Sequence, residues 1–182
     1  MSPSIFTIGH STREVGELIG LLQENGVHAL ADVRRYPASR RHPQFNREAL
    51  AASLQQAGIE YVSLPELGGR RAPAKDSPNT AWRSPGFRGY ADDMQSELFQ
   101  LAVARLGEIA RDKPTAFLCA EQAWQQCHRG LIADSLKSRG WDVRHILAPG
   151  RTEPHPWTAA ARIVNGDLTY AADDPVQQGF EF

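Results

Sequence analysis

The chain has 182 residues, of which 41% are hydrophobic and 23% charged, and its formal net charge at pH 7 is −1. These values are ordinary for a globular domain, and the near-zero charge excludes attraction of the whole molecule to nucleic acid or to a membrane surface. The chain has two cysteines, lacks an apolar run of about 18 residues and does not begin with the pattern of a secretory signal. We therefore expect a cytoplasmic protein with free thiols or a thiol-based site, and no association with a membrane.

Apolar runs of strand length alternate with segments that repeat apolar residues at helical spacing. In chain order we expect a strand at residues 4–8, a helix up to Gly26, a strand at 27–33, a helix from Asn46 to Gly58, a strand at 59–64, a long loop at 65–89, a helix at 90–111, a strand at 113–120, a helix at 129–139 and a strand at 141–147. Ser11 and Glu14 have the spacing of a capping box at the start of the first helix. The loop at 65–89 is rich in proline and glycine, and loops of this length are usually functional or mobile.

Strands that alternate with helices form βαβ units. The sequence therefore predicts an α/β fold class, with an open, mostly parallel sheet of about five strands and helices on both faces. We expect the strand order 3-2-1-4-5, which leaves a crevice between strands 1 and 4. Asn165-Gly166 lies between apolar residues and indicates a hairpin. We expect a single α/β domain over residues 1–182, with a core at 4–147 and, at 148–182, a hairpin-like C-terminal appendage on the edge of the sheet.

Three of the expected strands end in reactive or charged residues. His10 follows the first strand, Asp32, Arg34 and Arg35 lie at the end of the second, and Cys119 and Glu121 lie at the end of the fourth. Ligands bind open α/β sheets beyond the carboxyl ends of the strands. We therefore expect these side chains to line one site.

Two of these positions also have a purely structural interpretation. Asp32 follows a buried strand, where an unpaired carboxylate is costly. It forms a structural ion pair with Arg34 or Arg35, or it orients an arginine that binds substrate. His10 donates to a backbone carbonyl near the start of the helix, or it acts as an acid, a base or a metal ligand.

Residues 118–130 contain both cysteines of the chain. Cys119 is either a buried structural thiol or a nucleophile activated by nearby positive charge, and Glu121 is either a general base or a solvated loop charge. Cys127, His128 and Arg129 precede a helix, where backbone N–H groups and a guanidinium suit a phosphate or a carboxylate. The alternative for Arg129 is a position on the helix surface.

The same segment does not match common metal or phosphate motifs. Cys119, Cys127, His128 and His10 are the candidate ligands of an alternative metal site. The spacing C-x7-C-H is not a common zinc pattern, however, and adjacent Cys and His seldom both reach one ion, so no metal site is predicted. The sixth residue after Cys119 is Gln125 rather than the arginine of a cysteine phosphatase loop. Neither a Walker A motif nor G-x-G-x-x-G follows the first strand. We therefore expect no cofactor.

Arginine and aromatic residues occur together in the loops. The arginines are Arg34, Arg35, Arg40, Arg41, Arg47, Arg70, Arg71, Arg83 and Arg88, and the aromatic residues beside them include Tyr36, Phe45, Trp82, Phe87 and Tyr90. Guanidinium groups next to aromatic rings suit phosphates and stacked bases. We interpret these loops as a local patch for one anionic ligand, and the alternative is an ordinary solvated surface.

The motifs of the chain also resemble a known family. The segments "TIGHS", "DVRRYPASRR", "LGG", "FRGYADDM", "CAE", "CHRGLIADSL" and "VRHI", spread over residues 5–147, are similar to the bacterial and archaeal family DUF488. Asp93 departs from the family pattern, which often has an aromatic residue at that position. The resemblance implies one compact α/β domain and a shared site formed by His10, Asp32, Arg34, Arg88, Tyr90, Cys119, Glu121, Cys127, His128 and Arg129. It implies no reaction.

Our preferred interpretation is an enzyme that carries out hydrolysis or group transfer on an anionic substrate, either phosphorylated or containing a nucleobase. The predicted catalytic residues are Cys119, Glu121, His10 and Asp32, and the predicted substrate-binding residues are Arg34, Arg35, Arg88, Tyr90, Cys127, His128 and Arg129. Two alternatives are a nucleotide or nucleic-acid binding module without catalysis, and a metal-dependent hydrolase.

Overall fold

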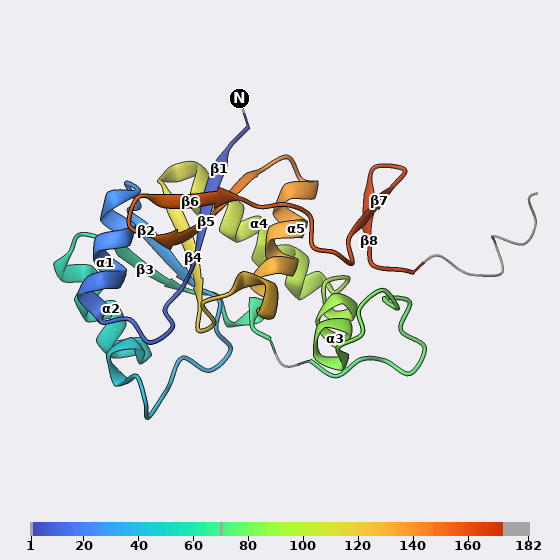
Figure 1. The fold of residues 1–182 in the computed structure, drawn as a ribbon, viewed down its shortest axis with the longest axis horizontal. Coiled ribbons are helices and arrows are strands. Elements are labelled where there is room, and N and C mark those ends of the chain that lie inside the picture. The colour runs from blue at the N-terminus through green and yellow to red at the C-terminus, as the bar shows by residue number, and fades with distance from the viewer. Residues whose placement is uncertain (1, 70, 173–182) are drawn as a thin grey trace, which may run out of the picture.

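The computed structural model describes residues 2–69 and 71–172, and its centre is a six-stranded sheet with the order β3-β2-β4-β1-β5-β6 (Figure 1). The strands are β1 (Ser4–Gly9), β2 (Ala29–Asp32), β3 (Glu60–Ser63), β4 (Thr115–Cys119), β5 (Asp142–Ala148) and β6 (Arg151–Pro154). Neighbouring strands are parallel except β6, which pairs antiparallel to β5. The predicted mostly parallel α/β fold is confirmed.

The predicted strand order 3-2-1-4-5 is wrong, because β4 lies between β2 and β1 and pairs with both. All five residues of β4 are buried, as expected of a central parallel strand that is covered on both faces. Gly9 is in register with Cys119, and Asp32 with Leu118. The ends of β1, β2 and β4 are therefore direct neighbours, with no crevice between strands 1 and 4.

Helices cover both faces of the sheet (Figure 1). They are α1 (Val15–Glu24), α2 (Arg47–Gln56), α3 (Pro85–Asp93), α4 (Glu97–Asp112) and α5 (Arg129–Ser138), with short 3-10 turns η1 (Pro43–Phe45), η2 (Pro65–Leu67) and η3 (Trp124–Gln126). One face packs Ile8 and Leu118 against α1 and α2, and the other packs Ile5 and Phe117 against α3, α4 and α5. This division follows the alternation of side chains along each strand.

Two expected helix boundaries were wrong. The capping box at Ser11 does not form, since α1 begins at Val15 and Ser11 adopts the left-handed region with φ of 50°. The single helix expected at 90–111 is two helices, α3 and α4. Ser96 separates them, because its side chain accepts a hydrogen bond from the backbone N–H of Phe99 and caps α4.

The C-terminal part of the described chain contains a hairpin of β7 (Arg162–Val164) and β8 (Asp167–Thr169), as Asn165-Gly166 predicts. Both turn residues have positive φ, which such a tight hairpin requires. The hairpin is a separate two-stranded sheet rather than an edge addition, and the strand that extends the main sheet is β6 instead. Residues 173–182 of the predicted appendage lie outside the described residues. Within the described part of the chain, every helix is too short or too polar to cross a bilayer.

Gly9 is required where β1 passes the loop that follows β4. A Cβ atom at this position would overlap the carbonyl oxygen of Glu121. We expect Gly9→Ala to lower the free energy of unfolding by roughly 3 kcal/mol, because the backbone must move to admit the methyl group. The measurement is urea unfolding followed by circular dichroism.

Gly20→Ala is the matched control, since a Cβ on this exposed glycine of α1 meets no atom within 4 Å. It should raise stability by about 0.5–1 kcal/mol because alanine restricts the unfolded chain and favours a helix. Equal stability of the two variants would contradict the close approach at Gly9.

Candidate functional site

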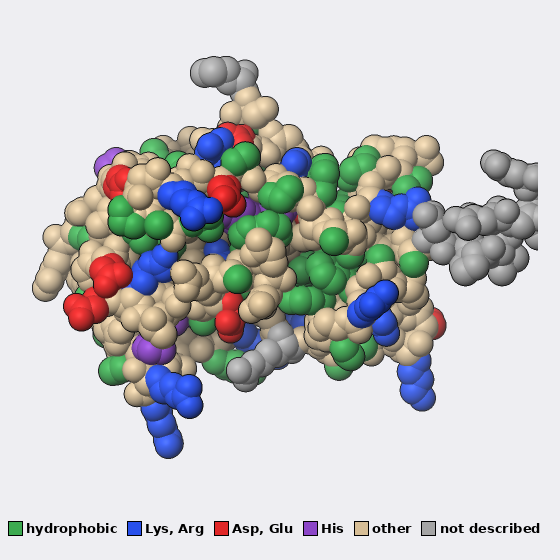
Figure 2. Space-filling model, viewed as in Figure 1, with side chains coloured by type: hydrophobic (Ala, Val, Ile, Leu, Met, Phe, Trp, Pro, Cys, Tyr) green, Lys and Arg blue, Asp and Glu red, His purple; other side chains and the backbone are tan. Residues whose placement is uncertain are grey.

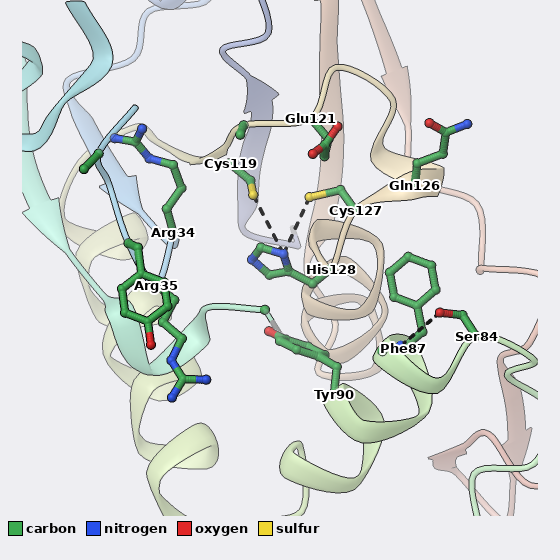
Figure 3. A pocket seen from close by; sticks show the side chains of 15 residues that line it. Arg34, Arg35, Ser84, Phe87, Tyr90, Cys119, Glu121, Gln126, Cys127 and His128 are labelled. Carbon is green, nitrogen blue, oxygen red and sulfur yellow. Dashed lines mark hydrogen bonds between the residues drawn. The ribbon is translucent and has the colours of Figure 1, made fainter. Parts of the chain in front are cut away.

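A pocket of about 430 Å³ lies beyond the carboxyl ends of β2 and β4 (Figure 3). Its walls come from the loop after β2, the residues after β4, the start of α5 and the first turn of α3. The lining residues are Arg34, Arg35, Tyr36, Ala38, Gly69, Ser84, Gly86, Phe87, Tyr90, Cys119, Ala120, Glu121, Gln126, Cys127 and His128. The structure therefore brings segments far apart in the sequence to one opening.

Two thiols and an imidazole meet in this pocket. Nδ1 of His128 lies 3.8 Å from Sγ of Cys119 and 3.7 Å from Sγ of Cys127. Figure 3 shows both sulfur atoms directed toward the same ring nitrogen. Both cysteines are buried and neither forms a disulfide. This Cys-Cys-His cluster is the most reactive group of side chains that lines the pocket.

The ring of His128 is held in one orientation. Its Nε2 lies 3.3 Å from the carbonyl oxygen of Val33, and a carbonyl only accepts, so Nε2 carries the proton of the neutral ring. Nδ1 is therefore the unprotonated nitrogen, with its lone pair toward the thiols. Tyr90 packs beside the same ring at 5.3 Å between centroids.

The pKa values of the two thiols are shifted in opposite directions. The hydrogen bond from the Cys119 thiol to Cys127, together with burial, raises the pKa of Cys119 well above its usual value. The same hydrogen bond, which the Cys119 thiol donates, lowers the pKa of Cys127 well below its usual value. The backbone N–H of Arg129 also donates to Sγ of Cys127 at 3.5 Å. Of the two thiols, Cys127 therefore ionises at the lower pH, whereas Cys119 is the one that the sequence predicts as a nucleophile.

Asp32 and Arg34 form a buried ion pair beside this cluster. Nε of Arg34 donates to Oδ1 of Asp32 at 2.9 Å, and Nη2 donates to Oδ2 at 2.7 Å. The carboxylate also accepts from the hydroxyl of Tyr61 at 2.6 Å, and the guanidinium donates to the carbonyl of Phe45. Such a bidentate pair fixes the plane of the guanidinium. Asp32 is therefore a residue that positions Arg34 at the wall of the pocket.

His10 supports the same arginine from the end of β1. Its Nδ1 donates to the carbonyl of Ser11 at 2.9 Å, and its Nε2 lies 3.4 Å from Nη1 of Arg34. Burial lowers the pKa of His10 to about 4. The ring is therefore neutral at pH 7 and accepts from Arg34, while it stacks on Phe45 at 4.4 Å between centroids. His10 does not line the pocket in this structure.

Arg129 is fully buried behind the pocket and binds protein groups. Nη2 donates to the carbonyls of Glu121 and Gln122 at 2.6 and 3.2 Å, and Nη1 donates to the hydroxyl of Thr7 at 2.8 Å. Among the described residues its Nε has no hydrogen-bond partner. The guanidinium therefore holds the loop after β4 against β1, and it is not among the residues that line the pocket.

The other predicted binding residues are distributed differently. Arg35 and the exposed Glu121 line the pocket. Tyr90 lines it with its ring, while its hydroxyl donates to the carbonyl of Leu67. Arg88 instead donates twice to the carbonyl of Trp82, outside the pocket. Arg70 lies outside the described residues.

Several functional positions were not found from the sequence. Gly69 faces the cluster so closely that a Cβ would lie 3.1 Å from Nδ1 of His128. Ser84 and Phe87 bring the first turn of α3 to the pocket. Gly69 belongs to the segment "LGG", which indicates the family but no role, and Ser84-Pro85 is a helix-start signal inside the predicted loop 65–89.

A chain of buried hydrogen bonds runs from Arg129 toward the C-terminal segment. Thr7 Oγ1, which accepts from Arg129, lies 3.0 Å from Nδ1 of His145. Nε2 of His145 lies 2.8 Å from Nδ1 of His155, and Nε2 of His155 lies 2.8 Å from Asp134. The carboxylate of Asp134 also accepts from the hydroxyls of Thr158 and Tyr170. Burial lowers the pKa of His145 to about 2, so this ring is neutral at pH 7.

Comparison with known proteins identifies one family. A family model described as "Domain of unknown function DUF488" matches residues 14–136. No curated protein and no solved structure matches the chain. The match includes β2, β3, β4 and the cluster residues Cys119, Cys127 and His128.

The lowered pKa of His10 makes the stability of the fold depend on pH. In the unfolded chain the imidazole takes up a proton as the pH falls through 6.5, whereas the folded protein resists protonation until about pH 4. Stability is therefore complete above pH 6.5 and is lost as the pH falls toward 4, with a slope of up to about 1.4 kcal/mol per pH unit for each such histidine. Urea unfolding of His10→Gln between pH 7.5 and 4.5 should show a smaller loss than the wild type. His28→Gln, at an exposed imidazole, is the control, and an equal loss in all three proteins would refute the role of His10.

Proposed function

The chain belongs to the DUF488 family, and from the geometry of its pocket we propose that it is a small enzyme that carries out hydrolysis or group transfer on an anionic substrate. The single observation that supports this proposal is that one pocket joins the Cys-Cys-His cluster to the guanidinium-bearing loop after β2. Reactive groups and anion-binding groups that line one cavity are typical of an active site. The paired thiols suit a reducing compartment, so the proposal includes the cytoplasm.

The anion-binding wall consists of arginines on a single loop. Arg34 and Arg35 line the pocket, and Arg35 also lies over the ring of Tyr36 at 5.4 Å. Tyr36 is 65% exposed, which is unusual for a large aromatic side chain and leaves its ring accessible to a ligand. Guanidinium groups bind phosphate oxygens with two parallel donors, and an exposed ring can stack on a base. We therefore propose a phosphorylated or nucleobase-containing substrate.

The remaining groups have complementary roles in this proposal. Glu121 is an exposed carboxylate on the pocket wall, where it can accept a proton from an attacking water. The neutral ring of His10 and the carboxylate of Asp32 position Arg34 rather than contact the substrate. Phe87 and Tyr90 form the apolar side of the pocket.

A second candidate function is binding of nucleic acid without catalysis. Figure 2 shows Lys and Arg side chains that project over the loop between β2 and α2. On this loop Arg40 and Arg41 are exposed and lie outside the pocket. These arginines would add contacts to a polynucleotide, whereas a small substrate would use Arg34 and Arg35 alone.

The contribution of the pocket arginines can be measured by equilibrium binding of a nucleoside monophosphate. Arg35→Gln should weaken binding by roughly tenfold, because one charge-assisted contact is worth about 1.5 kcal/mol. Arg41→Gln is the matched control on the same loop and should leave the affinity within a factor of two. A shallow salt dependence is expected, because few phosphates are contacted. Steep salt dependence for a single-stranded oligonucleotide, with equal losses in both variants, would support the second candidate instead.

Catalysis is tested by incubating the full chain with a panel of nucleoside phosphates and phosphorylated metabolites, followed by ³¹P NMR. We expect one class of compound to be consumed by the wild type, with loss of at least a hundredfold in rate for Cys127→Ser. Arg41→Gln should retain the wild-type rate because it lies outside the pocket. Consumption at equal rates by the wild type and Cys127→Ser would contradict an active site at the cluster.

A further inference from the structure

We propose that Cys119, Cys127 and His128 bind one zinc-class divalent metal ion, with a fourth coordination position open to the pocket. Binding of the metal ion to these three residues does not depend on the proposed reaction. The assignment of its open position to an oxygen of an anionic substrate, or to a water molecule, rests on the proposed function.

The distances within the cluster match those of a metal site. One ligand atom from each of the three residues lies within 4.8 Å of the other two, and the two sulfur-to-nitrogen distances are 3.8 and 3.7 Å. With Zn–S near 2.3 Å and Zn–N near 2.0 Å, tetrahedral ligands are separated by about 3.6 Å. The two sulfur-to-nitrogen distances are therefore within a few tenths of an ångström of those around a bound zinc ion. Two thiolates with one imidazole form a ligand set that selects zinc over magnesium or calcium.

The histidine is already oriented as a ligand. The hydrogen bond from Nε2 to the carbonyl of Val33 leaves the lone pair of Nδ1 directed toward the sulfur atoms. Zinc-binding histidines nearly always donate their second ring nitrogen to a carbonyl or carboxylate in this way, which fixes the tautomer.

The backbone explains how adjacent residues can reach the same ion. Cys127 is extended, with φ −134° and ψ 147°, at the end of η3, whereas His128 is helical, with φ −59° and ψ −12°, at the start of α5. The change of conformation between them brings both side chains to one side of the chain. Adjacent Cys and His seldom share an ion within regular structure, and here the pair lies at the junction of two elements.

Charge balance also favours a dication at this place. Cys119 and Cys127 are 6% and 4% exposed, and burial of two thiolates without a counter-charge is costly. A divalent ion with two thiolates and a neutral imidazole has zero net charge, and its binding releases the two thiol protons. Arg35 then contributes a positive charge to the pocket wall, as an anionic ligand requires, while Asp32 balances the charge of Arg34.

The fourth position lies on the open side of the cluster. The side chains of the three ligands all line the pocket, and Gly69 lacks the Cβ that would otherwise approach Nδ1 of His128. Three protein ligands with one open position are typical of catalytic zinc, whereas structural zinc sites have four protein ligands. When bound, such an ion lowers the pKa of a water molecule and polarises an oxygen of the substrate.

The first test uses the wild-type protein, purified under reducing conditions without chelators. We expect about one equivalent of zinc per chain after exhaustive dialysis. Removal of the metal and titration with Co²⁺ should give thiolate-to-cobalt charge-transfer absorption that saturates at one equivalent. Absence of both signals, or isolation of a Cys119–Cys127 disulfide in the protein without metal, would overturn the proposal without the use of any variant.

Variants then identify the ligands. Cys119→Ser, Cys127→Ser and His128→Gln should each weaken Co²⁺ binding by at least a hundredfold, and the His128 variant should retain charge-transfer bands at high cobalt because both thiolates remain. His10→Gln is the control, since His10 lies at the same sheet edge but is outside the cluster. Circular dichroism of each variant without metal identifies any that fail to fold. Unchanged affinity in a folded ligand variant would refute its assignment.

The metal and the reaction are separated by a third measurement, the rate of nucleotide turnover before and after removal of the ion. One tightly bound zinc without any turnover would support the metal site and contradict the proposed function. Turnover by the metal-free protein at the wild-type rate would support an enzyme and overturn the metal site. Turnover that is lost on chelation and restored by zinc is the result expected if both are correct.

Discussion

The buried guanidinium of Arg129 joins the two segments that carry the Cys-Cys-His cluster, namely the end of β4 and the start of α5. Arg129 follows Cys127 and His128 at the start of α5, and it binds the carbonyls of Glu121 and Gln122, which follow Cys119. It is 1% exposed, so its hydrogen bonds must compensate for the loss of water. The distance between the two sulfur atoms therefore depends on the side chain of Arg129, although this side chain does not line the pocket.

The charge of this guanidinium is balanced at a distance. Thr7, His145 and His155 connect Arg129 to the carboxylate of Asp134 through hydrogen bonds. Because hydrogen bonds link Arg129 to Asp134 without a gap, the two buried charges polarise a continuous path instead of lying isolated in the core. Asp32 and Arg34 instead balance their charges directly, through two hydrogen bonds between the carboxylate and the guanidinium.

Local patterns predicted most of the fold, and long-range packing accounts for the errors. The strands, the helices on both faces and the Asn165-Gly166 hairpin follow from periodicity and turn chemistry. The position of β4 between β2 and β1 depends on which of the apolar strands is buried most deeply. The sequence shows that all of these strands are apolar, but it does not rank them by burial. At the site, Cys119, Glu121 and Arg35 follow strand ends in the sequence, and they line one pocket in the structure. The sequence does not show that Arg129 faces inward or that Arg88 binds a carbonyl, because both depend on the direction of a side chain in three dimensions.

The family match and the folded unit have different boundaries. The match covers residues 14–136, whereas β1 lies at Ser4–Gly9 and β5 at Asp142–Ala148. β1 pairs with both β4 and β5 and carries Thr7, the partner of Arg129. A fragment cut to the matched residues would thus lose an interior strand and the support of its own reactive centre. The part of the chain that defines the family is held in shape by segments at both ends that the family model does not include.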